Sequence, residues 1–534
     1  MSNEKELIAA IDAGTTGIRC CIFDLQGNEL TEGYYKVPTV YPKAGYVEQN
    51  ATTVTELAFK AVAAAVSGAT ERAGLSEQHK TACHNDAPSK AIDPGNIIGL
   101  CITGQRNSFA PIDKTGKFIT DMLIWQDQRG GEAHAWMREQ LQKHGISTND
   151  FYRMNGQPFG TFQSGNKAIW LRKFNEEVYN KTYKLVTPVA FLSKAFGAED
   201  YFEENNDAGC WLVADADKNR IDTGLCNVFG LDPAKFLESV TPGTKVGMVS
   251  AKAAELTGLL QGTPIIIGSG DQQCGVLGAG NYGTADMMSV CMGTAGLCIA
   301  YSEKPVRHPD CLCNVQGHPA GGYTLEGHSS SCMSSFAWAR DIMCSKGLNG
   351  QQTEMPDTDI NAFATGLAIQ APVGSNGVLF LPYLQGAECP HYNAKARGAF
   401  IGMSLSTQKS AMIRSVMEGI CFENRMMIET LQHAEITPVK TLRVIGGAAN
   451  NIFWNQMQAD IYGLPVETVS AKECTALGTA IIGSVACGVY ANYKDAIGHM
   501  VHVKERYLPD AERSERYNDI YDYWNQCFLG LKWK

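Results

Sequence analysis

The chain has 534 residues, of which 44% are hydrophobic and 19% are charged, and its net charge is −10. This length exceeds what one hydrophobic core can organise, so we expect two large domains, residues 1–273 and 274–534. The negative charge argues against a nucleic-acid binder and against a membrane-surface protein. The 18 cysteines are scattered and form no pair of CxxC motifs, which is typical of reduced thiols in a cytoplasmic protein.

The first motif is a glycine-rich turn at residues 12–17, which lies between apolar runs at 7–11 and 18–23. This order predicts a strand, a tight turn and a second strand. Glycine lets an anion approach the backbone closely, and the hydroxyls of Thr15 and Thr16 can donate to phosphate oxygens. The carboxylate of Asp12 could hold a magnesium ion, directly or through water. An ordinary glycine-rich hairpin remains the alternative for this stretch taken alone.

The same pattern returns about half a chain length later. The apolar run 287–292 leads into Gly293-Thr294-Ala295-Gly296, and the apolar run 297–301 follows. A repeat at this distance indicates two similar halves rather than a short-period solenoid. Two such hairpins that face a shared cleft would suit a nucleotide site between domains.

Between the two hairpins, a helix is predicted at 52–68 and a polar surface insertion at 77–94. A buried strand at 97–103 ends in Gly104-Gln105-Arg106-Asn107. Parallel sheets bind ligands at the carboxyl ends of their strands, so Arg106 is a candidate for substrate hydroxyls, with a surface salt bridge as the alternative. The sequence Trp125 to Arg129 would suit the wall of a site for a polyhydroxylated ligand.

A second strand end carries a candidate base. The β-rich run 263–268 is followed by Ser269-Gly270-Asp271-Gln272-Gln273. The carboxylate of Asp271 is ionised at neutral pH and could accept a hydroxyl proton as the oxygen attacks phosphorus. An aspartate that only caps the following helix is the alternative.

The second half contains a long amphipathic helix at 410–432 and a strand at 442–445. The strand ends in Gly446-Gly447, which opens a helix and lets a flat ring or a phosphate lie against the backbone. Asn451 could bond a base or a ribose. Residues 475–488 predict a small-residue helix packed against neighbouring backbone, and 512–529 predict a packing helix.

These motifs in this order resemble the FGGY family of carbohydrate kinases almost from end to end. The resemblance implies an α/β fold of the two-domain actin and hexokinase type, which is ribonuclease H-like. Each domain then has a central mixed sheet with flanking helices, and the ligands bind in the cleft between the domains. It also implies that ATP with Mg²⁺ phosphorylates a hydroxyl of a small-molecule sugar or polyol. The first domain would carry the sugar and the base, and the second would carry the nucleotide.

The resemblance assigns roles to individual residues. Asp271 is implied as the catalytic base, and Asp12 and Asp271 as magnesium ligands, through water where they do not bind directly. The residues implied to bind the nucleotide are Asp12, Gly14, Thr15, Thr16, Arg19, Gly293, Thr294, Gly446, Gly447 and Asn451. The residues implied to bind the substrate are Gln105, Arg106, Asn107, Trp125, Asp127, Phe162, Asp271 and Gln272.

The substrate pocket departs from the family's known patterns. Glycerol kinases carry Arg-Glu where this chain has Arg106-Asn107, and a tyrosine where it has Phe162, whereas xylulokinases carry Met-His at the 106–107 pair. The substrate therefore stays open between a ketopentose, a tetritol or pentitol, and a sugar-like signal such as that of autoinducer-2 kinases. A non-catalytic nucleotide-binding sensor and a phosphohydrolase are the competing hypotheses. The sequence leaves open whether the chain forms a homodimer.

Overall fold

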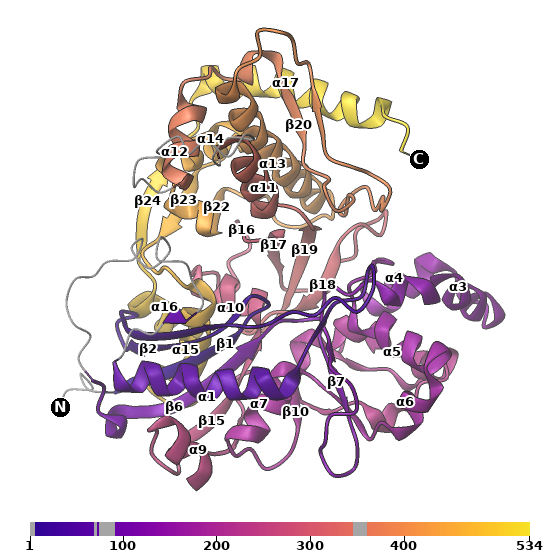
Figure 1. The fold of residues 1–534 in the computed structure, drawn as a ribbon, viewed down its shortest axis with the longest axis vertical. Coiled ribbons are helices and arrows are strands. Elements are labelled where there is room, and N and C mark those ends of the chain that lie inside the picture. The colour runs from indigo at the N-terminus through magenta and orange to yellow at the C-terminus, as the bar shows by residue number, and fades with distance from the viewer. Residues whose placement is uncertain (1–5, 69–71, 74–90, 345–359, 534) are drawn as a thin grey trace, which may run out of the picture.

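The computed structural model describes residues 6–68, 72–73, 91–344 and 360–533. Of the predicted insertion at 77–94, residues 77–90 lie outside the described residues. Two seven-stranded mixed sheets, one in each half of the chain, organise the molecule. Figure 1 shows them as two lobes, with the N-terminal half in indigo and magenta below and most of the C-terminal half in orange above.

The first sheet is built around the predicted glycine-rich hairpin. β1 and β2 are antiparallel, and β1 is parallel to β6, which is parallel to β15. The strands follow in the order β14 (Lys245–Met248), β15 (Pro264–Gly270), β6 (Ile97–Gly104), β1 (Leu7–Ala13), β2 (Gly17–Asp24), β3 (Glu29–Lys36) and β5 (Arg72–Ala73). The runs 7–11, 18–23, 97–103 and 263–268 are thus confirmed as strands.

The second sheet repeats this plan. β16 and β17 form the second antiparallel hairpin, and β16 is parallel to β22, which is parallel to β23. The order is β18 (Asn314–Gly317), β19 (Tyr323–Ser329), β17 (Gly296–Ser302), β16 (Met287–Met292), β22 (Thr441–Gly446), β23 (Val466–Val469) and β24 (Val503–Tyr507). Both hairpins have a three-residue loop, 14–16 in the first and 293–295 in the second. The two similar halves predicted from the repeat are therefore confirmed.

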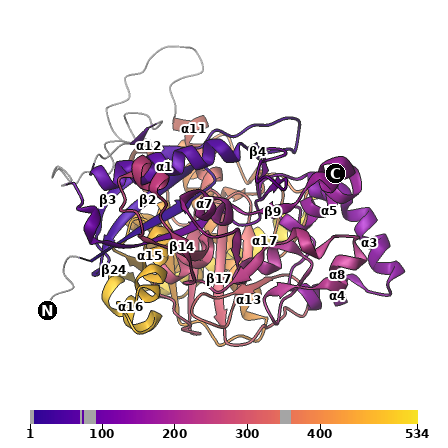
Figure 2. The same cartoon turned by 90° about the horizontal axis from the view of Figure 1, so that it is seen from below.

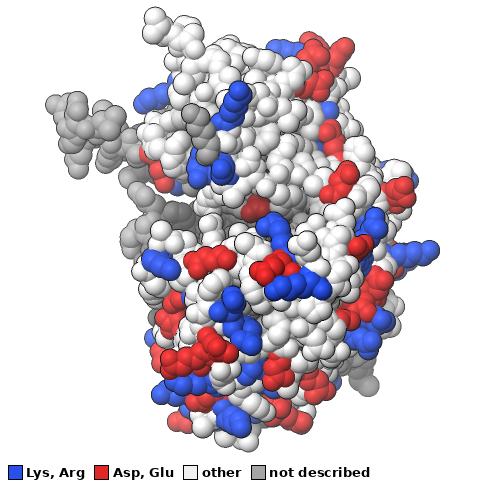
Figure 3. Space-filling view, turned by 90° about the vertical axis from the view of Figure 1, so that its right-hand side faces the viewer, with Lys and Arg blue, Asp and Glu red and all other residues white. Residues whose placement is uncertain are grey.

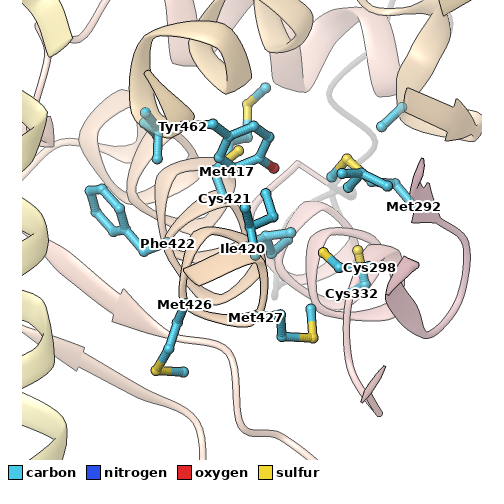
Figure 4. Close-up of a cluster of buried hydrophobic side chains, with 14 of the residues drawn as sticks. Met292, Cys298, Cys332, Met417, Ile420, Cys421, Phe422, Met426, Met427 and Tyr462 are labelled. Atoms are coloured by element: carbon cyan, nitrogen blue, oxygen red, sulfur yellow. The ribbon is translucent and has the colours of Figure 1, made fainter. Parts of the chain in front are cut away.

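The C-terminal core surrounds α13 (Lys409–Gln432), the predicted amphipathic helix. Figure 4 shows Met417, Ile420, Cys421 and Phe422 of this helix among buried sulfur-rich and aromatic side chains. α17 (Ala511–Gly530) is confirmed as a packing helix, because it buries four aromatic residues, Tyr517, Tyr521, Trp524 and Phe528. α11 (Met333–Cys344), α12 (Ile360–Ile369) and α14 (Ile452–Tyr462) complete this lobe.

The N-terminal sheet is covered on one face by its own helices and on the other by helices from the end of the chain. α1 (Ala51–Ser67) packs on β2 and β3, and α7 (Pro188–Phe196) packs on β6 and β15. α15 (Cys474–Ala486) packs on β1 and β6, with α16 (Tyr493–Met500) beside it. In Figures 1 and 2 these two helices lie in gold beside the indigo strands.

A helical group flanks this sheet, to the right in Figure 1. It comprises α3 (His134–Lys143), α4 (Thr148–Asn155), α5 (Ser164–Phe174), α6 (Glu176–Lys181) and, further along the chain, α8 (Thr223–Val228). These helices share one hydrophobic cluster, which includes Met137, Phe151, Leu171, Tyr179 and Leu225.

The two halves are joined by two helices that cross at glycine. α10 (Asp271–Gly278) meets α15, and a Cβ on Gly278 would lie 1.9 Å from the carbonyl oxygen of Cys474. A Cβ on Gly478 would lie 1.8 Å from the carbonyl oxygen of Cys274. Only glycine fits at either position, and this confirms the tight backbone packing predicted for the small-residue helix. The predicted division between residues 273 and 274 falls within α10 and stays a prediction.

Candidate active site

A cavity of about 860 Å³ lies between the two sheets. Seen from the side, the surface is hollowed between the lobes, and acidic and basic side chains alternate on its lower rim (Figure 3). Both glycine-threonine hairpins contribute to the lining. The predicted site residues that line this cavity are Asp12, Thr15, Thr16, Arg106, Asn107, Trp125, Phe162, Asp271, Gln272, Gly293, Thr294 and Gly446.

The first hairpin presents a half-buried carboxylate, one oxygen of which is fully buried. Asp12 lies one residue before the end of β1, and its Oδ1 atom is buried without a hydrogen-bond partner. Burial raises the pKa of Asp12 to about 7. The guanidinium of Arg19 lowers this pKa, and the negative charge of Asp271 raises it further. A buried carboxylate oxygen without a donor is expensive, so this atom fits a cation or a donor that arrives with the ligand.

Side chains from three other segments hold the turn of this hairpin. The indole N–H of Trp125 donates to the Thr15 hydroxyl at 2.7 Å, and that hydroxyl donates to Gln105 at 3.3 Å. The amide of Gln49 donates to the Thr15 carbonyl at 2.7 Å. The predicted substrate wall and the predicted phosphate loop are thus parts of one hydrogen-bonded unit.

Asp271 begins α10 immediately after β15. Gly270 is the N-cap, so Asp271 is the first helical residue and not the cap, and its Oδ1 atom accepts the backbone N–H of Gln272 at 2.8 Å. A helix N-terminus stabilises an ionised carboxylate. Burial raises the pKa of Asp271, and the Arg106 guanidinium opposes that rise. Gly270 must lack a side chain, because a Cβ there would lie 2.5 Å from Cδ of Arg106.

Arg106 connects the two lobes at the floor of the cavity. Its guanidinium forms a bidentate pair with Glu326 of β19, at 3.0 Å and 2.8 Å. Its Nε atom lies 3.8 Å from Asp271, and a terminal nitrogen lies 4.0 Å from Asp207. Arg106 therefore does form a salt bridge, but the alternative of a surface pair is wrong. The pair is buried, because the side chains of Arg106 and Glu326 are only 8% and 2% exposed.

A buried lysine fixes the other substrate-wall residues. The ammonium of Lys167 in α5 donates to the carbonyls of Asn107, Ile124 and Phe162 at 2.6, 2.9 and 2.9 Å. It therefore anchors the three segments that carry Asn107, Trp125 and Phe162. Burial lowers the pKa of Lys167 to about 7, because a charged ammonium is costly to bury. The hydrogen bonds to three carbonyls offset part of this free-energy cost.

The second hairpin is held by backbone groups. The carbonyl of Gly293 accepts the N–H of Met333, and that of Thr294 accepts the N–H groups of Cys332 and Ser334. Beside it, Gly446 ends β22 with φ of 93°, and a Cβ there would lie 2.4 Å from the Met292 carbonyl oxygen. The loop is thus fixed from behind while Gly293 and Thr294 stay exposed to the cavity.

Comparison with known proteins gives this arrangement a family. The FGGY family of carbohydrate kinases matches with its N-terminal domain over residues 7–278 and with its C-terminal domain over residues 288–487. The chain belongs to this family. It is therefore a phosphotransferase that acts on an alcohol group of a carbohydrate.

Individual relatives agree with the family but differ in substrate. A glycerol kinase of Acaryochloris marina is 29% identical over 91% of both chains. A xylulose kinase of Lactococcus lactis is 25% identical over 98% of this chain and 96% of that protein. Among solved structures, the xylulose kinase of Lactobacillus acidophilus superposes with a TM-score of 0.81 at 19% identity over 98% and 97% of the two chains. These structural likenesses establish the fold of the two-domain actin and hexokinase type.

The structure leaves six predicted site residues of this kinase outside the cavity lining, and their roles toward ligands stay predictions. Asp127 is fully buried, where it bonds Arg129 and the N–H of Val47, so the side chain supports the wall rather than facing the cavity. Arg19 pairs with Glu32 and Glu473. The remaining residues are Gly14, Gln105, Gly447 and Asn451, of which Gln105 bonds the Gln49 side chain and Asn451 caps α14.

Sequence reasoning missed the part of the kinase cavity that β18 and β19 form. Asn314, Gln316, Glu326 and His328 line the cavity, and all four are at most 9% exposed. The available signal is their alternation, Asn-x-Gln in one strand and Glu-x-His in the next. Such alternation normally indicates a half-exposed strand, so the pattern alone would favour a solvent face.

Among the described residues, no helix combines the length and apolar character that a membrane crossing needs.

Proposed function

We propose that this kinase transfers the γ-phosphoryl group of ATP to a hydroxyl of a small sugar or polyol, with Asp271 as the general base. A ketopentose, a tetritol, a pentitol or a related sugar-like molecule would serve as the acceptor. The observation that carries the proposal is that Asp271 lines the same cavity as both glycine-threonine hairpins. The proposed base, the proposed phosphate loops and the proposed substrate wall therefore line one cavity.

The residues present fit the magnesium that the family's chemistry implies. Asp12 offers a buried, unpartnered carboxylate oxygen, and the charge of Asp271 acts on it across the cavity. These two carboxylates would hold the cation, which would neutralise charge on the phosphates. The exposed Gly293 and Thr294 leave room for phosphate oxygens, and Gly446 would let the nucleotide lie close to the backbone.

The chemical step follows from these positions. The Asp271 carboxylate accepts the proton of the acceptor hydroxyl as that oxygen forms a bond to the γ-phosphorus. The bond between the γ-phosphorus and its bridging oxygen breaks, and the electron pair leaves with ADP. Phosphoryl transfer of this kind depends on positioning and charge stabilisation more than on covalent chemistry. Closure of the lobes around both substrates would exclude water and limit ATP hydrolysis.

The test is turnover with ATP and Mg²⁺ across a panel of ketoses and polyols, followed by ADP release and by ³¹P NMR of the phosphate ester. Asp271→Asn should lower kcat by roughly 10²–10⁴-fold. Asp519→Asn on the exposed face of α17 is the matched control and should leave kcat unchanged. Undiminished turnover in Asp271→Asn would show that the base is wrongly assigned.

Two other outcomes separate the competing functions. ATP binding without transfer to any acceptor would indicate a nucleotide-binding sensor. Release of inorganic phosphate at the same rate with and without acceptor would indicate a phosphohydrolase. If a phosphate ester formed only on a sugar-like signal molecule, the proposed mechanism would stand, and the acceptor would be that signal molecule instead of a ketopentose, tetritol or pentitol.

A further inference from the structure

We propose that the polar face of the β18–β19 hairpin is the distal half of the substrate site, and that it selects an uncharged polyhydroxylated chain over sugar acids and phosphorylated sugars. This inference rests on the proposed kinase function and narrows its substrate class. The distal face is defined here as Asn314, Gln316, Glu326 and His328.

The strand geometry places these four side chains on one surface. Side chains two residues apart in a strand point to the same face, which groups Asn314 with Gln316 and Glu326 with His328. Asn314 lies directly opposite Glu326 in the antiparallel register, so the two pairs share a face. All four residues line the cavity that also holds Asp271.

Three of these side chains carry a buried polar atom with no hydrogen-bond partner. These atoms are Oδ1 of Asn314, Oε1 of Gln316 and Nδ1 of His328, in residues that are 4%, 3% and 9% exposed. Asn107, which also lines the cavity, adds an unpartnered Oδ1 atom. Buried polar atoms are normally satisfied, and four unsatisfied ones on residues that line one cavity indicate a ligand that supplies the donors. Hydroxyl groups supply donors without bringing charge.

The surroundings of His328 suit a carbon chain that bears such hydroxyls. Its ring lies 5.1 Å from the Phe162 ring and 6.1 Å from the Trp125 ring, measured between centroids. Aromatic faces cover C–H groups while the polar atoms take the hydroxyls. Burial, with the neighbouring Arg106 charge, lowers the pKa of His328 to about 4, so the imidazole is neutral and offers an acceptor nitrogen.

The charge balance near the base opposes an anionic substrate. The Arg106 guanidinium pairs with Glu326 through two hydrogen bonds and lies within 4.0 Å of both Asp271 and Asp207. One cation is therefore already shared among three acidic side chains. A carboxylate or phosphate on the substrate would add a further negative charge here. The Arg106 guanidinium could not neutralise it, because it is already paired with acidic side chains.

The other positive charges of the lining lie elsewhere. Among the described residues that line the cavity, Lys36 and Lys472 are the remaining lysines and arginines. Lys36 ends β3 opposite Gly17 of the first phosphate hairpin, and Lys472 precedes α15; both are exposed. These positions suit the nucleotide phosphates and leave the distal face without a free cation.

The first test uses matched pairs that differ only in one terminal group. Ribitol and xylitol are compared with ribonate and xylonate by kcat/KM and by calorimetric binding to the wild-type kinase. Ribitol 5-phosphate is compared with ribitol by kcat/KM alone, because it is the ester that phosphorylation of ribitol would form and would bind as a product. We expect each anionic member to show a kcat/KM at least about 100-fold lower than its neutral partner, because like charges meet in a desolvated site. An anionic member that is used or bound as well as its neutral partner would overturn the selectivity.

The second test addresses the distal face directly. His328→Phe keeps a ring between Phe162 and Trp125 and removes the acceptor nitrogen, so we expect the KM for the preferred neutral substrate to rise about tenfold with ATP binding unchanged. His328→Gln restores an acceptor and should recover part of the loss. His433→Gln, at the exposed end of α13, is the control. An unchanged KM in His328→Phe would contradict the assignment.

Binding data keep the two proposals apart. Neutral members that bind to the wild-type kinase but accept no phosphoryl group would support the distal face and overturn the proposed function. Phosphoryl transfer to neutral and anionic members alike would support the function and overturn the distal face. Failure of every neutral member to bind would also overturn the distal face.

Discussion

The two glycine-threonine hairpins share a backbone plan but differ in what they carry. Their three-residue loops align Thr15 with Thr294 and Asp12 with Cys291. The first hairpin thus presents a half-buried carboxylate and is braced by the side chains of Gln49, Gln105 and Trp125. The second presents a thiol at that position and is braced mainly by backbone N–H groups at the start of α11, with the Ser334 hydroxyl as a side-chain donor to the Thr294 carbonyl. Under the proposed function, the repeat would supply two anion-binding loops, and the first of them, which is tied to the substrate wall, would also hold the cation.

The largest effect is expected when the carboxylate that only the first hairpin carries, that of Asp12, is removed. Asp12→Asn should lower kcat by at least about 100-fold, because the cation that neutralises the phosphates would lose a charged ligand while the shape of the hairpin is kept. The apparent affinity for Mg²⁺ should fall in parallel in a metal titration. Cys291→Ser, at the matching position of the second hairpin, is the control and should keep kcat within about threefold. Equal losses in both variants would show that the hairpins have the same role.

The next largest effect concerns the anchor of the substrate wall. Lys167→Met removes the ammonium donor that three carbonyls share, so we expect the KM for the sugar or polyol to rise about tenfold, with a lower thermal midpoint and a nearly unchanged KM for ATP. Lys173→Met, an exposed position on the same helix, is the matched control. A KM for ATP that rises as much as the KM for the sugar would contradict a role confined to the substrate wall.

A third prediction concerns stability in the C-terminal lobe. Burial raises the pKa of Glu423 to about 8 from an ordinary value near 4.5, so between these values the folded state binds more protons than the unfolded state. The free energy of unfolding should therefore fall as pH rises through this window, by up to about 1.4 kcal/mol per pH unit. Glu423→Gln keeps the acceptor for Ser329 and should flatten this dependence in denaturant titrations, whereas Glu429→Gln, on the same helix, should not. An unaltered slope in Glu423→Gln would refute the assignment.

The smallest effect is expected at the hydroxyl of the second hairpin. Thr294→Ala should raise the KM for ATP by less than about fivefold, because under the proposed function the backbone of this loop would make the main contacts with phosphate. Thr15→Ala should cost more, since its hydroxyl also bonds Trp125 and Gln105. Steady-state kinetics with ATP as the varied substrate would compare the two, and a reversed order would contradict the difference between the hairpins.

Local patterns predicted the elements that carry the chemistry. The apolar runs beside each glycine-rich turn predicted both hairpins, and the strand end at Gly270-Asp271 predicted that the proposed base lies at the carboxyl edge of a sheet. The small-residue pattern of α15 predicted close backbone packing. It could not name α10 and the first sheet as partners, because α10 lies about 200 residues before α15 in the sequence, and β1 and β6 lie further away still.

The distal face escaped prediction for a related reason. Arg106 and Glu326 lie 220 residues apart in sequence, and no local pattern links them. The alternating polar residues of β18 and β19 are typical of an exposed strand, and only the tertiary fold buries them against the first lobe. Asp127 shows the opposite case. Its motif predicted a side chain that binds the substrate, whereas the structure buries that side chain, where it bonds Arg129.

The most direct test of the central claim is a crystal structure of the kinase with ADP, Mg²⁺ and the best neutral substrate from the panel. The account predicts one substrate hydroxyl within about 2.6–3.2 Å of an Asp271 carboxylate oxygen, facing the two hairpins. A substrate bound with every hydroxyl out of reach of Asp271 would contradict it.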